Sequence, residues 1–280
     1  MKIIEPKVEL LSEIGISPES HIARCARVCY GKEYKEPNQE ADKKMVDGLI
    51  KRNHLSMLRH NSAYFVFTNH LPEEFKSEYV NTLSQENYIY ASTNGQFTLE
   101  HNNKADLNSH VFLNLCRKYP ELFKLYRLTF CITTQISTSR ELNRCSPNAI
   151  AERSTRYCSS KDGLLICRPW WLSSAKEAAF NSHSSINELW CYNNAISKVE
   201  EAYLTLLGQG MKPEDARGIL PLDTATKVIY TYSIREWKHI LDLRLYDKTG
   251  KAHPNAHVVM QMVKDQINDF AKEHNINYQV

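Results

Sequence analysis

Arginine and hydroxyl side chains gather in one stretch of the chain, residues 138–160. A guanidinium fork donates two parallel hydrogen bonds to a phosphate, and neighbouring hydroxyls and loop amides add neutral donors. Two acids lie among them, Glu141 and Glu152. The stretch therefore predicts a phosphate-binding loop, although its spacing fits a solvated, arginine-rich surface turn equally well. The potential donors are Arg140, Arg144, Arg153, Arg156, Ser146, Ser154, Thr155 and Tyr157.

The segments before this loop should position it. Residues 125–134 are predicted to form a strand that leads directly into the stretch. Residues from about 134 to 143 have helix-forming side chains, with Leu142 on one face. Pro147 and Asn148 then break the pattern, because proline lacks a backbone donor and restricts the residue before it. We therefore expect a strand, a short helix and a polar loop in that order.

The chain as a whole predicts an α+β fold, a single domain over residues 1–280 with long helices packed on a mixed β-sheet. We expect residues 71–124 to be an inserted segment, in which Asn94-Gly95 is typical of a hairpin turn. Strands are predicted at 3–10, 62–67, 164–167 and 227–232. Helices are predicted at 17–30, from 38, at 71–83, 106–118, 185–207, 213–219 and 234–245, and after residue 254.

The composition bounds the class of protein. The 280 residues are 42% hydrophobic and 24% charged, which are ordinary globular values, and the net charge is +3. We expect no nucleic-acid polymer as a partner, because nothing indicates a polyanion-binding surface; a small anion needs only a local basic site. No run of eighteen apolar residues occurs, so we expect a soluble, cytoplasmic protein without a membrane partner.

The cysteine and glycine patterns limit which metal sites and cofactors the chain could hold. The 8 cysteines are scattered without a Cys-x-x-Cys pair, which indicates reduced and mostly buried thiols. His21, Cys25 and Cys29 share one face of a predicted helix, where core packing is our interpretation and a metal site the alternative. The chain contains no G-x-G-x-x-G motif and no complete Walker loop, since residues 248–251 are interpreted as a turn. Any dinucleotide cofactor must therefore be held by side chains.

The string SRELNR…ERSTRYC resembles, without gaps, the signature of the flavin-dependent thymidylate synthases. That signature is Arg-His-Arg, seven residues, a serine and a short Arg-Tyr. Arg144 matches the first arginine, Ser154 the serine, and Arg156 begins the closing pair. Cys145 replaces the histidine and Ser146 replaces the second arginine. The nucleotide half of the signature is thus intact and the flavin half is altered.

A second segment, HLSMLRH, is similar to the family's flavin-contacting segment. His54 and Ser56 match it, and Arg59 stands where the family usually has glutamate. A third, ARGILPLDTATK, places Lys227 where some members have a basic contact to the nucleotide phosphate.

SIREWKHILDLR is similar to a helix that follows in the family's order. Arg235, His239 and Arg244 match it, and Ser233 replaces an asparagine. NGQFTL within residues 71–124 resembles a longer subgroup of the family. The resemblance therefore covers most of the chain.

The resemblance implies reductive methylation of dUMP to dTMP. Methylenetetrahydrofolate would supply the carbon, FAD would carry the hydride and NADPH would reduce the flavin, without attack by an enzyme cysteine. The protein would contribute positioning and electrostatics. It also implies a homotetramer with sites at subunit junctions, so that one polypeptide alone should not make a complete site.

The resemblance also assigns roles to residues. Arg244 and Ser154 would be catalytic; a fixed guanidinium at the uracil edge would stabilise the negative charge that develops there. The substrate-binding residues would be Glu141, Glu152, Arg153, Ser154, Arg156, Lys227 and Arg244. The cofactor-binding residues would be His54, Ser56, Arg144, Cys145, Ser146, Arg235 and His239. We expect no metal ligands.

Two other hypotheses stay open. A sister enzyme could transfer a one-carbon unit to another pyrimidine nucleotide, as a C5 hydroxymethylase or methylase, and the changes on the flavin side fit altered chemistry. A non-catalytic nucleotide-binding relative without flavin is the second. A yellow colour on purification would separate the enzymes from the binding protein.

Overall fold

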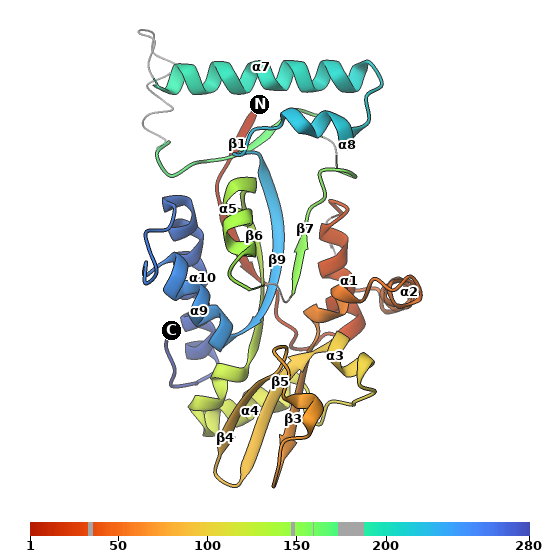
Figure 1. The fold of residues 1–280 in the computed structure, drawn as a ribbon, viewed down its shortest axis with the longest axis vertical. Coiled ribbons are helices and arrows are strands. Elements are labelled where there is room, and N and C mark those ends of the chain that lie inside the picture. The colour runs from red at the N-terminus through yellow and green to blue at the C-terminus, as the bar shows by residue number, and fades with distance from the viewer. Residues whose placement is uncertain (33–35, 147–148, 159, 173–187) are drawn as a thin grey trace.

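The computed structural model describes residues 1–32, 36–146, 149–158, 160–172 and 188–280, which form the predicted α+β fold (Figure 1). The strands are β1 Lys2–Ile4, β2 Lys7–Leu10, β3 Ser62–Phe67, β4 Asn81–Gln85, β5 Tyr88–Asn94, β6 Arg127–Gln135, β7 Ile150–Glu152, β8 Leu165–Cys167 and β9 Ala225–Ser233. The helices are α1 Pro18–Val28, α2 Gln39–Lys51, α3 Gly95–Glu100, α4 Ser109–Lys118, α5 Ile136–Asn143, α7 Glu188–Gly208, α8 Pro213–Ala216, α9 Ile234–Arg244 and α10 Pro254–Glu273. Short 3₁₀ helices are η1 Leu55–His60, η2 Glu73–Phe75, η3 Pro120–Leu125 and η4 Arg217–Ile219.

The described strands divide over three sheets instead of one mixed sheet. The largest is antiparallel, in the order β2-β6-β9-β7, and the second is the antiparallel sheet β3-β5-β4. The parallel pair β1-β8 is the third. Strands β6 and β9 pair along their full lengths, and every residue of β6 is buried. These two strands form the centre of the four-stranded sheet.

The four-stranded sheet is covered on both faces, because successive strand residues point to opposite sides. Phe130 and Val228 belong to the main core, with α9 and α10 on the same side (Figure 1). Their neighbours Cys131 and Ile229 pack on the other side with Cys25 of α1. We call these the α9/α10 face and the α1 face.

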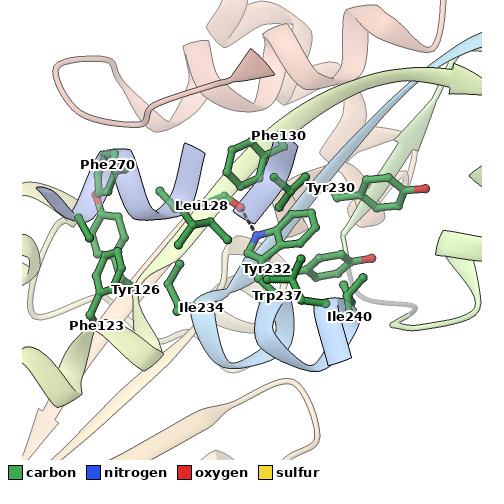
Figure 2. Packing of buried hydrophobic residues seen from close by; sticks show 14 of the residues in the cluster. Phe123, Tyr126, Leu128, Phe130, Tyr230, Tyr232, Ile234, Trp237, Ile240 and Phe270 are labelled. Carbon is green, nitrogen blue, oxygen red and sulfur yellow. Dashed lines mark hydrogen bonds between the residues drawn. The ribbon is translucent and has the colours of Figure 1, made fainter. Parts of the chain in front are cut away.

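Trp237 anchors α9 on the sheet. Its indole Nε1 donates to the Leu128 carbonyl at 3.1 Å, and its ring lies edge-on to Phe130 at 5.2 Å (Figure 2). Buried indole N–H groups need such a partner. A capping box starts the helix: Ser233 Oγ accepts from the Glu236 amide, and the Glu236 carboxylate accepts from the Ser233 amide. Ser233 is therefore the residue that ends β9 and caps α9.

Two predictions within residues 71–124 are wrong. No helix forms over 71–83: after the 3₁₀ turn η2, residues 81–85 pair with β5 as strand β4, because a sheet partner outweighs local helix propensity. The hairpin turn lies at Glu86, whose φ is +53°, and not at Asn94. Asn94 instead accepts hydrogen bonds from the Gln96 and Phe97 amides and starts α3, since asparagine is a helix cap as well as a turn residue.

The other elements fall close to their predicted positions, with two exceptions. The opening strand is two strands on either side of Pro6, and strand β7 lies within the stretch predicted as a polar loop, where it pairs with β9. The proposed break at residues 147–148 and the start of the 185–207 helix lie outside the described residues. That residues 71–124 are an insertion in a single domain stays a prediction. None of the described helices combines the length and apolar character needed to cross a membrane.

Candidate functional site

A cavity of about 730 Å³ opens where β7 and β9 meet the loop after β7. This volume is typical of small-molecule sites. Its polar wall comes from α5, β7, the loop and η4, so segments far apart in the sequence converge on it. The lining residues are Ile136, Arg140, Glu152, Arg153, Ser154, Thr155, Arg217, Gly218, Leu220, Pro221, Leu222 and Thr226.

Glu152 is the carboxylate of this cavity, and neighbouring hydroxyls hold it in place. Its Oε1 accepts hydrogen bonds from Ser139 Oγ at 2.7 Å and from Thr226 Oγ1 at 3.0 Å. Asn143 Nδ2 lies 3.4 Å from Oε2. A carboxylate fixed by partners on α5 and β9 has one orientation, which suits it to accept hydrogen bonds from a ligand.

Backbone hydrogen bonds fasten the loop after β7 to β9 and to the end of α1. The Arg153 amide donates to the Lys227 carbonyl at 2.8 Å, and the Ser154 amide donates to the Cys29 carbonyl at 3.0 Å. Ser154 Oγ accepts from the Arg156 amide at 3.2 Å. The hydroxyl of Ser154 therefore keeps its own proton for donation to a ligand at the cavity wall.

Arg217 is a cavity residue that our sequence reasoning did not single out. Its Nη1 donates to Thr155 Oγ1 at 3.0 Å, and its Nε donates to the Glu214 carbonyl at 3.1 Å. The signal was present, because Arg217 belongs to the string ARGILPLDTATK. With Arg140 and Arg153, it brings three guanidinium groups to one cavity.

Arg156 is not among the described residues that line the cavity. Its guanidinium pairs with Glu214 at 3.2 Å and lies 5.5 Å from the centre of the Tyr157 ring. Both partners of this ion pair are exposed, and such a pair contributes at most about 1 kcal/mol. A phosphate could therefore recruit Arg156 at small energetic cost, and its role in substrate binding stays a prediction.

Arg244, Glu141 and Cys145 form a second group, separate from the described lining of the cavity. Arg244 Nε lies 3.4 Å from Glu141 Oε1, and its Nη2 donates to the Glu141 carbonyl at 3.4 Å. The Cys145 thiol is 3.7 Å from the same carbonyl. Burial raises the pKa of Cys145, and the nearby Arg244 guanidinium opposes this shift only in part. The thiol is therefore protonated near neutral pH.

The residues expected at the flavin come from three elements: η1, the end of α5 and α9. Those with exposed side chains are His54, Ser56, Arg144, Arg235 and His239. Arg235 Nη2 donates to the Thr82 carbonyl at 3.0 Å. Ser146 is instead buried, with its carbonyl accepting from the Tyr232 hydroxyl at 2.7 Å. Arg59 donates to Gln96 Oε1 at 2.7 Å.

The face shared by His21, Cys25 and Cys29 is packed into the protein. His21 Nε2 lies 3.1 Å from Thr129 Oγ1, and Arg24 Nε donates to His21 Nδ1. Cys25 is fully buried. Within the described part of the chain, no group of three or more potential ligands is placed to hold a metal ion.

A family described as "Thymidylate synthase complementing protein" has a sequence model that matches residues 76–271. This match covers well over half of the chain. The protein belongs to the flavin-dependent thymidylate synthase family.

Relatives named flavin-dependent thymidylate synthase occur in bacteria and archaea. One from Synechocystis sp. is 26% identical over 158 residues, which cover 54% of this chain and 73% of the relative. One from Halobacterium salinarum is 32% identical over 77 residues, 27% of this chain and 31% of the relative. A solved UMP/dUMP methylase, PolB from Streptomyces cacaoi bound with 5-Br dUMP, aligns with a TM-score of 0.45 and 15% identity. That alignment covers 97% of this chain and 93% of PolB.

Proposed function

We propose that this flavin-dependent thymidylate synthase family member converts dUMP to dTMP by reductive methylation. The observation that carries the proposal is the 730 Å³ cavity, which is lined by the fixed Glu152 carboxylate together with hydroxyl and guanidinium donors. A nucleotide monophosphate needs both kinds of group, because its phosphate accepts hydrogen bonds and its sugar and base also donate them. Methylenetetrahydrofolate would donate the carbon, and NADPH would be the reductant.

The phosphate would lie against the loop after β7. Ser154 and Thr155 supply hydroxyls there, and Arg217 supplies a guanidinium that already donates a hydrogen bond to Thr155. Arg153 adds a further charge at the cavity wall. Glu152 would then orient the rest of the nucleotide, as its fixed carboxylate allows.

The uracil contact assigned to Arg244 lies outside the described lining of this cavity within one chain. We therefore propose that a second copy supplies it, in a homotetramer with sites at subunit junctions. The separation of Arg244 and Glu141 from Glu152 and Ser154 supports an assembly of this kind. Light scattering would measure the oligomeric state, and a monomer would contradict the proposal.

The residues available for FAD fit a dinucleotide in their chemistry. Arg144, Arg235 and His239 expose cationic or neutral donors that can bind a diphosphate, and His54 and Ser56 add smaller polar groups. Cys145 and Ser146 contribute no charge. Bound FAD would supply the hydride that the methylation needs. The chain's part is to hold the cofactor and to exclude water around the nucleotide.

One observation favours a second candidate function. The signature is altered only on the flavin side, at Cys145 and Ser146, while Glu152 and Ser154 remain in the cavity. Such a change would suit a flavin-dependent enzyme that methylates or hydroxymethylates a different pyrimidine nucleotide. The function experiment must therefore compare substrates.

The experiment is product analysis on dUMP, UMP and dCMP with methylenetetrahydrofolate, FAD and NADPH, together with rescue of a thymidine-requiring strain. We expect a yellow protein that forms dTMP from dUMP and rescues the strain. Product from UMP or dCMP alone would favour the sister enzyme, and a colourless protein that binds dUMP without turnover would favour the non-catalytic relative. Ser154→Ala should weaken dUMP binding roughly tenfold or more, since a hydrogen bond to a charged group is lost.

We expect Cys145→Ser to keep most of the turnover, because a protonated thiol is a poor nucleophile and the proposed chemistry needs none. Initial rates of dTMP formation would measure this, with Cys191→Ser as the matched control at an exposed cysteine. Mass spectrometry that found a covalent nucleotide adduct on Cys145 would contradict the expectation.

A further inference from the structure

Two buried tyrosines of β9, Tyr230 and Tyr232, lie on the α9/α10 face of the four-stranded sheet beside Trp237 (Figure 2). Because both side chains are fully buried, each hydroxyl needs a hydrogen-bond partner inside the protein. Tyr230 donates to Asn143 Oδ1 at 2.7 Å. Tyr232 donates to the Ser146 carbonyl at 2.7 Å. The strand therefore holds the end of α5 and the residues after it through two hydroxyl groups.

The hydroxyl of Tyr230 sets the orientation of the Asn143 amide. It has one proton, and its 2.7 Å bond to Asn143 is much shorter than its 3.4 Å distance to the Ser139 carbonyl. Burial raises the pKa of Tyr230 well above its usual range, so the hydroxyl is protonated near neutral pH and donates. The amide must then turn its oxygen toward the tyrosine, which points its Nδ2 group the other way.

The Nδ2 group of Asn143 meets the carboxylate of the cavity, at 3.4 Å from Glu152 Oε2. An ionised carboxylate only accepts hydrogen bonds, so the reversed amide would place two acceptors against each other. The other oxygen, Oε1, already accepts from the Ser139 and Thr226 hydroxyls. The long contact to Asn143 leaves Oε2 as the oxygen that can accept a hydrogen bond from a nucleotide.

These hydrogen bonds run from the core to the cavity. Glu152 and Thr226 line the cavity, whereas Asn143 and Tyr230 are not among its described lining residues. In the sheet, Glu152 pairs with Val228, which belongs to the same core cluster as Tyr230. Alternation along β9 therefore puts the tyrosine, Thr226 and the carboxylate on the face that contacts α5.

We propose that Tyr230 is a positioning residue of the cavity, which orients the Glu152 carboxylate through the Asn143 amide. The proposal rests on the proposed function only for the nucleotide that the carboxylate would receive. Asn143 is the last residue of α5, and Glu152 is the last residue of the edge strand β7, so both side chains lie where regular structure ends. The Tyr230 ring packs against Tyr232 and Trp237 and gives both a fixed reference.

Calorimetry with dUMP on Tyr230→Phe, which removes the hydroxyl and keeps the ring, measures the effect. Binding should weaken about two- to tenfold, as for the loss of one neutral hydrogen bond, because the amide can then reverse beside Glu152. Tyr232→Phe is the matched control: it removes an equally buried hydroxyl from the same strand, and the acceptor that it leaves is the Ser146 carbonyl. It should leave the dUMP affinity unchanged. Thermal unfolding should show a similar loss of stability in both variants.

A double-mutant cycle shows whether the tyrosine acts through the amide. Asn143→Ala should weaken dUMP binding at least as much as Tyr230→Phe does. Adding Tyr230→Phe to Asn143→Ala should then have no further effect on the dUMP affinity, since the group that it orients is gone. Losses that add up would overturn the proposal. An unchanged dUMP affinity in Tyr230→Phe, or an equal loss in Tyr232→Phe, would overturn it too.

Thermal unfolding separates this proposal from the proposed function, because it needs no ligand. Tyr230 and Glu152 each hydrogen-bond to Asn143, so a coupling by hydrogen bonds between them runs through that amide. Glu152→Gln supplies an amide that can bond to Asn143 in either orientation. Tyr230→Phe should therefore lower the Tm less in Glu152→Gln than in the unmodified protein, and equal losses would overturn the positioning role. Absence of dUMP binding in the unmodified protein would contradict only the proposed function.

Discussion

Replacing Arg244 by alanine should lower kcat roughly a hundred- to a thousandfold, the size of effect seen when a donor to a developing negative charge is removed. The loss of dUMP affinity should be much smaller, because the interaction strengthens only as charge builds on the uracil oxygen. The Arg244 guanidinium is held in place by its neighbours. Its side chain is only 16% exposed, and Glu141 lies 3.4 Å from its Nε. Among the described residues, that buried Nε has this ion-pair contact but no hydrogen bond.

Steady-state kinetics and dUMP calorimetry on the same variants measure the two effects separately. Glu141→Gln is the matched control: it keeps the shape beside Arg244 but removes the charge of its partner, so it should lower kcat less than Arg244→Ala. Arg244→Lys keeps a charge and loses the planar fork, and should fall between the two. Equal losses in kcat and dUMP affinity for Arg244→Ala would instead indicate ground-state binding alone.

The elements that the sequence predicted well are those decided by neighbouring residues. Ser17 and Asn38 cap α1 and α2 as expected, because a cap needs only the amides three residues further on. The helix prediction for residues 81–85 was wrong, because pairing with strand β5 determines their conformation. The turn prediction at Asn94 was wrong, because asparagine favours helix caps and turns through the same side-chain chemistry. Local rules therefore located most elements but not the pairing within 71–124.

The same distinction applies to the site. Glu152 and Ser154 were predictable because they lie in one short signature. Arg217 joins them only after the chain folds back across about sixty residues, as its bond to Thr155 shows. Lys227 was predicted for the nucleotide phosphate, and it follows the cavity residue Thr226 on β9 and lines a neighbouring pocket that shares Arg153 with the cavity. Its contact to the phosphate stays a prediction.

The altered half of the signature should make FAD binding weak while dUMP binding stays strong. A hydrogen bond to a charged group contributes roughly 1.5–3 kcal/mol. Loss of one arginine contact at Ser146 would therefore weaken FAD binding about ten- to a hundredfold. Arg59 replaces an acid near the same segment, and its guanidinium is held by Gln96 and lies 5.3 Å from the centre of the Tyr79 ring. This fixed positive charge should offset part of the loss, so that FAD is partly lost on purification.

Restoring the signature with Cys145→His and Ser146→Arg should tighten FAD binding or leave it unchanged. The contact that Ser146 makes to Tyr232 uses its carbonyl and not its side chain, so the substitution can keep that hydrogen bond. Because Ser146 is buried, the new arginine must extend to the surface, and thermal unfolding should accompany the binding measurement. Cys145 is half-buried beside Arg244, where a neutral histidine adds volume but no repulsive charge.

Calorimetry with FAD and with dUMP on four proteins measures the flavin half and the nucleotide half of the site separately. Ser154→Ala and Arg156→Ala should damage dUMP binding and spare FAD, whereas the restored variant should change FAD binding alone. The unmodified protein supplies the reference for both ligands. If the restored variant stays folded but binds FAD more weakly, the loop has been rebuilt around different contacts. The correspondence of Cys145 and Ser146 to the family's histidine and arginine would then say little about function, and the sister-enzyme hypothesis would gain support.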